Sequence, residues 1–188
     1  MVEVMVDEND ELNEEWRQIE LALNNTEAFA PLYKKYIQKI FRYCYHKIGS
    51  QEDARDIAQQ VFVKAILNLK TFKNKGFGLS PWLYKIALNE INDWIKHKNR
   101  EEYWVNKELV WAEMGVIKDV NQEIFDDQML ESALTKLSQD SLEIIRLRYF
   151  EKLPFAEVAE ILSITENNAK VKVHRTINEL RTYITKKN

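Results

Sequence analysis

The sequence predicts an all-α protein made of two small helical domains that an acidic linker joins. The 188 residues include only 4 glycines and 3 prolines, whereas β-sandwiches, barrels and Rossmann sheets need many turn residues. In several segments apolar residues recur every three or four positions, which is the period of an amphipathic helix. Because 45% of the residues are hydrophobic and 30% are charged, the chain is expected to fold around a core.

Composition also bounds the environment of the protein. The single cysteine, Cys44, excludes a disulfide framework and a cysteine-built zinc site, and it fits a reducing compartment. No apolar run approaches the roughly 18 residues that a membrane span needs, and the acidic N-terminus lacks the basic-then-apolar order of a signal peptide. We therefore expect a cytoplasmic protein with no membrane insertion and no cofactor.

The charge alternates along the chain in four blocks. Residues 1–29 carry nine acids against one Arg, and residues 30–100 carry fourteen Lys and Arg against five acids. Residues 101–131 carry nine acids against two Lys, whereas residues 132–188 carry ten basic and seven acidic residues. Two basic blocks separated by an acidic one indicate a polyanionic partner, although lysines that merely solubilise helices would give the same pattern.

The first 25 residues are interpreted as an acidic N-terminal extension. They are expected to form a short helix around Trp16, Ile19 and Leu23, preceded by a frayed tail. We expect this extension to solubilise the chain; an autoinhibitory or regulator-binding arm is the alternative.

Residues 26–100 are expected to form the first domain, a bundle of three helices. Thr26 is expected to cap a helix over 27–49, and Ser50 to cap the next one. A loop over 71–80 leads to a third helix, which has Pro81 in its first turn. Trp82 and Trp94 are interpreted as core residues of that helix; aromatic stacking platforms are the alternative. The apolar stripe of the second helix consists of Ala54, Ile57, Val61, Ala65 and Leu69.

The second domain is expected over residues 132–188, after a linker over 101–131 in which apolar periodicity is weak. Ser138 is expected to cap its first helix, with Leu137 and Leu142 placed for a hydrophobic staple.

The second domain also contains the pattern of a helix-turn-helix. A short helix begins at Pro154, a three-residue turn occupies 163–165, and Thr165 caps a second helix. The second helix has an apolar stripe of Ala169, Val173, Ile177 and Leu180. The opposite face carries Asn167, Val171, His174, Arg175 and Asn178, with Lys170 and Lys172 at its flanks. A major groove admits such a helix, so the pattern predicts DNA binding, with Arg175 suited to a bidentate contact with guanine.

Two segments resemble the σ70 family of RNA polymerase sigma factors, and specifically its small extracytoplasmic-function (ECF) group. The similarity to region 2 of the family lies in EDARDIAQQVFVKAILNLKTF, followed by SPWLYKIALNEINDWIKHKNR. The similarity to region 4 lies in LTKLSQDSLEIIRLRYFEKLPFAEVAEILSITENNAKVKVHRTINELR. Both segments occur in the family's order and at its separation. Three departures are Gln60, where the family usually has Glu, Ser163, where it usually has Gly, and Asn167-Asn168-Ala169, where Gly-Thr-Val is common.

The resemblance implies three functional surfaces. The helix after Ser50 would dock on core polymerase through Asp56, Gln59, Gln60, Phe62 and Lys64, of which Phe62 could instead be core. The following loop and helix would open the −10 DNA element and hold its single strand, through Phe72, Lys73, Lys75, Phe77, Asn89, Asn92, Asp93, Lys96, Lys98 and Arg100. The second helix of the helix-turn-helix would read the −35 element, through Thr165, Asn167, Asn168, Lys170, Val171, Lys172, His174 and Arg175.

The implied function is that of a sigma factor, which binds core RNA polymerase and directs promoter-specific transcription initiation. The resemblance also implies promoter DNA and an anti-sigma factor as partners, a monomer when bound to polymerase, and a linker that threads the polymerase cleft. The alternative is a stand-alone helix-turn-helix repressor or activator that acts as a dimer. An enzyme is not expected, because no P-loop, GxSxG or HExxH motif occurs.

Overall fold

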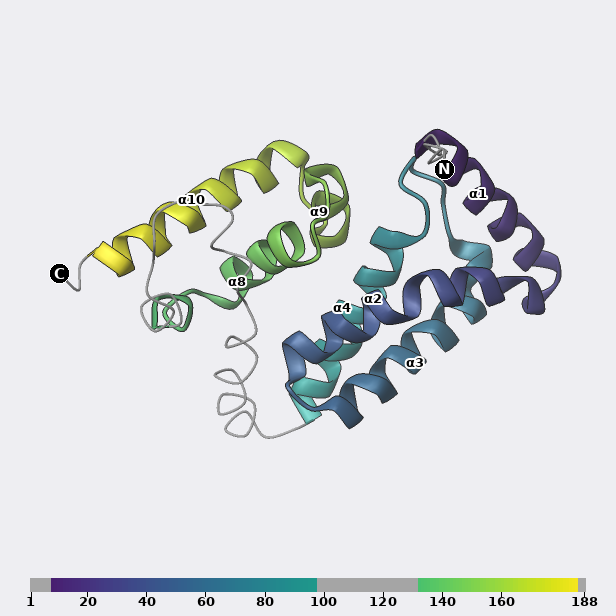
Figure 1. Cartoon of the computed structure of the whole chain (residues 1–188), viewed down its shortest axis with the longest axis horizontal. Coiled ribbons are helices and arrows are strands. Elements are labelled where there is room, and N and C mark those ends of the chain that lie inside the picture. Colours follow the sequence, from purple (N-terminus) through teal and green to yellow (C-terminus); the bar gives the residue numbers. More distant parts are fainter. Residues whose placement is uncertain (1–7, 98–131, 186–188) are drawn as a thin grey trace, which may run out of the picture.

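The computed structural model describes residues 8–97 and 132–185, and all regular structure in these ranges is helical. Two groups of helices lie side by side, one coloured purple to teal and the other green to yellow in Figure 1. The prediction of an all-α protein with two small helical domains is confirmed. The predicted linker over 101–131 lies outside the described residues.

Each domain contains α-helices together with short stretches of tighter or wider helix. The first domain consists of α1 (Glu8–Asn24), the 3-10 turn η1 (Thr26–Phe29), α2 (Ala30–Ile48), α3 (Gln51–Asn68), the 3-10 turn η2 (Leu69–Thr71) and α4 (Ser80–His97). The second domain contains α8 (Gln139–Ile145), the π-helical turn η4 (Arg146–Phe150), α9 (Phe155–Leu162) and α10 (Glu166–Thr185).

Side-chain caps fix the starts of three helices where the sequence placed them. Ser50 and Ser138 each accept a hydrogen bond from the backbone N–H three residues later, and Thr165 does the same at the start of α10. The predicted cap at Thr26 is wrong. Asn25 accepts from a backbone N–H instead, and the 3-10 turn η1 precedes α2.

Helix α1 is an integral part of the first domain, so the predicted solubilising tail is wrong for the described part of the extension. Ile19 and Ala22 are buried in the core, and Trp16 stacks on Phe72. Leu23 is 38% exposed, because the buried side of α1 passes from Ile19 to Ala22, three residues on, and not to Leu23.

The core of the first domain lies where α2, α3 and α4 pack against one another. Ile40, Tyr43 and Ile91 are fully buried there, and the ring of Tyr43 meets the ring of Tyr84 edge-on at 5.1 Å. The predicted stripe of α3 is confirmed, because all five of its residues are buried: Ala54, Ile57, Val61, Ala65 and Leu69.

The two domains also pack against each other. Helix α9 lies on α4, and buried residues of α8 and α9 continue the core of the first domain in one cluster. A smaller cluster, which includes Leu134, Leu142 and Leu180, joins α8 to α10. Residues on one side of α3, in much of the loop before α4 and on one side of α10 remain exposed.

Candidate nucleic-acid and polymerase interfaces

Helix α10 has one buried side and one exposed polar face, although Ile177 of the predicted stripe is only half-buried and the polar Thr176 is buried beside it. Ala169, Val173 and Leu180 are buried in the packing against α8 and α9. The turn before the helix places Ser163 in the left-handed region, at φ 55° and ψ 43°. Every residue predicted to read the −35 element is exposed: Thr165, Asn167, Asn168, Lys170, Val171, Lys172, His174 and Arg175.

The exposed face of α10 offers the chemistry that a DNA groove recognises. Lys170 pairs with Glu166 one turn earlier, with 2.6 Å between Nζ and Oε1, and such exposed pairs are weak enough to be exchanged for a phosphate. Val171 is 39% exposed among polar side chains, and an apolar group there suits a thymine methyl. The face therefore combines cations, amides and an apolar contact.

The loop over residues 72–79, between η2 and α4, gathers aromatic rings. Phe72 contacts two tryptophans, with ring centroids 5.6 Å from Trp16 and 5.1 Å from Trp82. Phe77 is half-buried, and the loop surrounds a hollow of about 260 Å³. Trp82 is half-buried: it packs against the core of the first domain, as predicted, and it also lines that hollow. Ring faces of this kind are what unstacked bases bind.

Cations and amides extend this surface from the loop onto α4. Lys73 and Lys75 are exposed on the loop. Lys96 Nζ lies 2.9 Å from the Asp93 carboxylate, and its hydrogen bond lowers the pKa of Asp93. The predicted polar residues of α4 that the structure describes are exposed: Asn89, Asn92, Asp93 and Lys96. Lys98 and Arg100 lie outside the described residues.

The outer face of α3 carries most of the predicted polymerase contacts. Asp56, Gln59 and Gln60 are exposed. Lys64 is also exposed and pairs with a carboxylate of α4. Phe62 requires a correction: it is 2% exposed and contacts the rings of Phe29 and Tyr33, so it belongs to the core and not to this surface.

Two apolar side chains that the sequence reasoning missed extend the outer face of α3. Val63 is 56% exposed and Leu67 is 75% exposed. They follow Gln59 at intervals of four residues, so the three side chains share one side of the helix. Exposed apolar groups beside polar ones are typical of a protein-binding surface. The signal was available, because both residues fall outside the predicted buried stripe.

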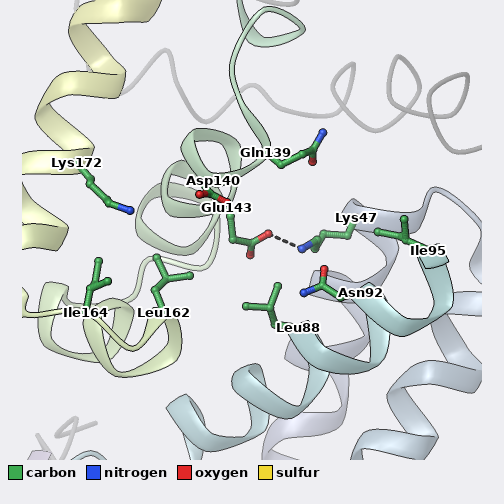
Figure 2. A pocket seen from close by; sticks show the side chains of 10 residues that line it. All are labelled: Lys47, Leu88, Asn92, Ile95, Gln139, Asp140, Glu143, Leu162, Ile164 and Lys172. Atoms are coloured by element: carbon green, nitrogen blue, oxygen red, sulfur yellow. Dashed lines mark hydrogen bonds and ion pairs between the residues drawn. The ribbon is translucent and has the colours of Figure 1, made fainter. Parts of the chain in front are cut away.

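Several hydrogen bonds between the domains run from donors on the first domain to acceptors on the second. Figure 2 shows Lys47 and Glu143 meeting across the domain boundary, beside a groove of about 410 Å³ that Lys172 also lines. In the described ranges, carboxylates of the second domain accept hydrogen bonds from hydroxyl and ammonium groups of the first. The pairs are Glu143 with Tyr43 and Lys47, Glu151 with Tyr84, Glu157 with Ser80, and Glu160 with Lys75.

Glu143 is buried at the centre of these contacts. Its carboxylate accepts from Tyr43 OH at 2.6 Å and from Lys47, and Arg146 lies 3.3 Å away. Burial alone would raise the pKa of Glu143, but Lys47 and Arg146 outweigh it and hold that pKa below its ordinary value. At Glu151 the donor is a neutral hydroxyl, and burial raises the pKa of that carboxyl.

Over residues 8–97 and 132–185, no helix combines the length and apolar character needed to cross a membrane. The same ranges contain no group of three or more His, Cys, Asp or Glu side chains that could hold a metal ion.

Two family models match the chain in the order of its domains. Sigma-70 region 2 matches residues 32–101, and Sigma-70, region 4 matches residues 127–180. The ECF RNA polymerase sigma factor SigW of Bacillus subtilis is 31% identical over 167 residues, which cover 82% of this chain and 88% of SigW. The ECF RNA polymerase sigma factor BldN of Streptomyces coelicolor is 27% identical over 162 residues, which cover 82% of this chain and 59% of BldN.

Solved structures share the fold. CnrH, in complex with the cytosolic domain of CnrY, aligns with a TM-score of 0.63 at 20% identity, over 93% of this chain and 98% of CnrH. The sigma factor RpoE in complex with the anti-sigma factor NepR, from Bartonella quintana, aligns with a TM-score of 0.57 at 23% identity, over 84% of this chain and 96% of RpoE. Region order, helical architecture and similarity to SigW therefore agree: the chain belongs to the ECF group of RNA polymerase sigma factors, which direct promoter-specific transcription initiation.

Proposed function

We propose that this sigma factor divides its task among three surfaces. The outer face of α3 docks on core RNA polymerase. The loop over 72–79 and the outer face of α4 open the −10 element and hold its single strand. The exposed face of α10 reads the −35 element. The observation that carries this division is that α10 buries Ala169, Val173 and Leu180 while all eight predicted reading residues remain in solvent.

The proposed −10 surface has the two components that a single strand requires. Base–aromatic stacking contributes about 1–3 kcal/mol per base, and Phe72, Phe77 and Trp82 surround the hollow. Lys73 and Lys75 on the same loop are placed to pair with the strand's phosphates, which adds affinity that falls as salt rises.

The proposed polymerase surface is a mixed one. Asp56, Gln59 and Gln60 provide polar groups, and Val63 and Leu67 provide apolar area beside them. A helix face of this composition suits a coiled-coil partner, because the apolar residues bury area while the polar ones fix the register.

The partners of this chain follow from the same proposal. It works as a monomer on core polymerase, in the cytoplasm where transcription occurs, and it acts by binding and not as an enzyme. RpoE was solved with the anti-sigma factor NepR and CnrH with the cytosolic domain of CnrY. By analogy, we propose that an anti-sigma factor also binds this chain.

Transcription with purified components tests the proposal. The protein is mixed with core polymerase and a promoter library in which the −35 and −10 sequences are randomised, and the transcripts are sequenced. We expect specific transcripts that share two sequence elements. Asp56→Arg and Gln59→Ala are expected to abolish them, because both change the docking face of α3 without touching its buried stripe.

Matched substitutions on other exposed faces serve as controls. Glu20→Arg on α1 and Gln38→Ala on α2 change exposed residues of the same chemical type, and both should leave transcript yield unchanged. Sequence-specific duplex binding by a free dimer, with no gain on adding core polymerase, would contradict the proposal and favour a stand-alone repressor or activator.

A further inference from the structure

Two consecutive residues of α1 hold the two ends of the loop over 72–79. At its start, the ring of Trp16 stacks on Phe72, with a centroid distance of 5.6 Å and planes 17° apart. At its end, the carboxylate of Glu15 accepts a hydrogen bond from the backbone N–H of Leu79 at 2.6 Å. The N-terminal helix therefore braces the loop that carries the proposed −10 contacts.

Glu15 is a buried carboxylate with several hydrogen-bond donors around it. Its side chain is 3% exposed, and Lys35 Nζ lies 2.7 Å from Oε2. Tyr36 OH donates to the same carboxylate, at 2.7 Å from Oε2 and 2.9 Å from Oε1. Lys35 and Tyr36 belong to α2, so one carboxylate ties together α1, α2 and the end of the loop. A buried carboxylate with three donors is held firmly in place.

The backbone of the loop fits this carboxylate closely. Gly78 has φ +63°, in the left-handed region that favours glycine. A Cβ added at Gly78 would lie 2.7 Å from Glu15 Oε1, which is too close for the two atoms to coexist. The shape of the loop and the position of Glu15 are thus matched to each other.

We propose that Glu15 and Trp16 are positioning residues for −10 recognition, which fix the loop over 72–79 in the shape that accepts a single DNA strand. This inference rests on the proposed function of the loop. Neither residue needs to touch DNA. By holding both ends, they reduce the conformational entropy that Lys73, Lys75 and Phe77 lose when a strand binds.

Binding of two DNA probes by holoenzyme tests this role. The first probe is a fluorescent single strand with the −10 sequence that wild-type holoenzyme selects from the randomised library; the second is a duplex with the selected −35 sequence. We expect Glu15→Ala to weaken single-strand binding about tenfold, because an unbraced loop must be ordered on binding. Affinity for the −35 duplex should not change, since the hydrogen bonds of Glu15 go to α2 and to the loop.

Three further variants separate positioning from general destabilisation. Glu15→Gln should retain most single-strand affinity, because an amide oxygen still accepts from Leu79 N–H and Tyr36 OH. Glu14→Ala removes the adjacent, exposed acid, whose partners Arg17 and Gln18 lie on the same helix, and should behave as wild type. Gly78→Ala should weaken single-strand binding, and by less in a Glu15→Ala background, where only the clash with the carboxylate is relieved.

The outcomes distinguish the inference from the proposed function. A folded Glu15→Ala holoenzyme that binds the single strand as tightly as wild type would overturn the inference, as would an equal loss of −35 affinity. If Glu15→Ala does not fold, Trp16→Ala compared with Trp16→Phe decides by the same two probes. Wild-type holoenzyme that selects no −10 sequence would overturn the proposed function itself, and the inference with it.

Discussion

Removal of the Glu143 carboxylate is expected to separate the two domains. In Glu143→Ala, Tyr43, Lys47 and Arg146 lose the acceptor that they share. Removing one partner of a buried ion pair costs about 3–5 kcal/mol, because a charge stays buried without compensation. Lys47 lies on the first domain and Arg146 on the second. Domain separation therefore returns both cations to water, at the expense of the apolar contacts between α9 and α4.

Small-angle X-ray scattering and urea unfolding check this prediction. The radius of gyration of Glu143→Ala should rise, and the first domain should keep a cooperative unfolding transition. Glu143→Gln should open less, because its amide oxygen still accepts from Tyr43 OH. The control is Glu166→Ala, which removes an exposed pair with Lys170 and should change stability by about 0.5 kcal/mol or less. A Glu143→Ala protein with the wild-type radius and the wild-type free energy of unfolding would refute the reasoning.

Four further predictions concern single residues. Ser163→Gly should raise the midpoint of thermal unfolding, because a left-handed conformation costs a non-glycine residue about 1 kcal/mol and glycine removes this cost. Loss of the hydrogen bond that Lys85 donates to the hydroxyl offsets only part of the gain. An unchanged or lower midpoint would contradict this prediction. Glu160→Ala should strengthen single-strand binding by the free protein about two- to fivefold, measured by anisotropy, since it releases Lys75 from an exposed ion pair; equal binding would count against a role for Lys75. Cys44 is fully buried, and burial raises the pKa of its thiol to about 12; its reaction with a thiol reagent should therefore follow the unfolding rate, whereas a fast reaction in native buffer would disprove the packing of α2. Burial raises the pKa of Glu151 in the folded state, so the protonated carboxyl stabilises the fold below the ordinary value of 4.5, and this stabilisation is lost as pH rises through the raised pKa. Glu151→Gln should therefore be more stable than wild type at neutral pH, and the difference in free energy of unfolding should shrink in acid. A difference that does not depend on pH would exclude this cause.

Helix starts and buried stripes could be predicted because they depend on residues close in sequence. Ser50 and Thr165 need only a backbone N–H three residues later, and the spacing of the apolar residues of α3 alone determines which side of it is buried. The cap at Thr26 failed for a related local reason, because Asn25 next to it caps at least as well and selects a 3-10 turn. The polar residues of α10 were found in the same way.

Burial of polar groups could not be predicted, because it depends on partners far away in the sequence. Nothing in the local sequence around Glu15 distinguishes it from its exposed neighbour Glu14, yet its partners lie 20 to 64 positions further on. Glu143 likewise meets donors that lie 96 and 100 positions earlier. The docking of the domains follows from such pairs, and so it was absent from the prediction. For Phe62 the ambiguity was between two sides of one helix, which packing against Phe29 resolved.

The separation of acids and donors onto opposite domains has a consequence for protein engineering. Hybrid sigma factors join the polymerase-binding module of one relative to the promoter-reading module of another. If this chain supplied the promoter-reading module, its four interdomain carboxylates would face side chains that evolved to contact another protein's second domain. The packing of the two domains in the free protein, rather than promoter choice, is then the first property to change. Introducing the matching donor side chains on the polymerase-binding module would restore that packing.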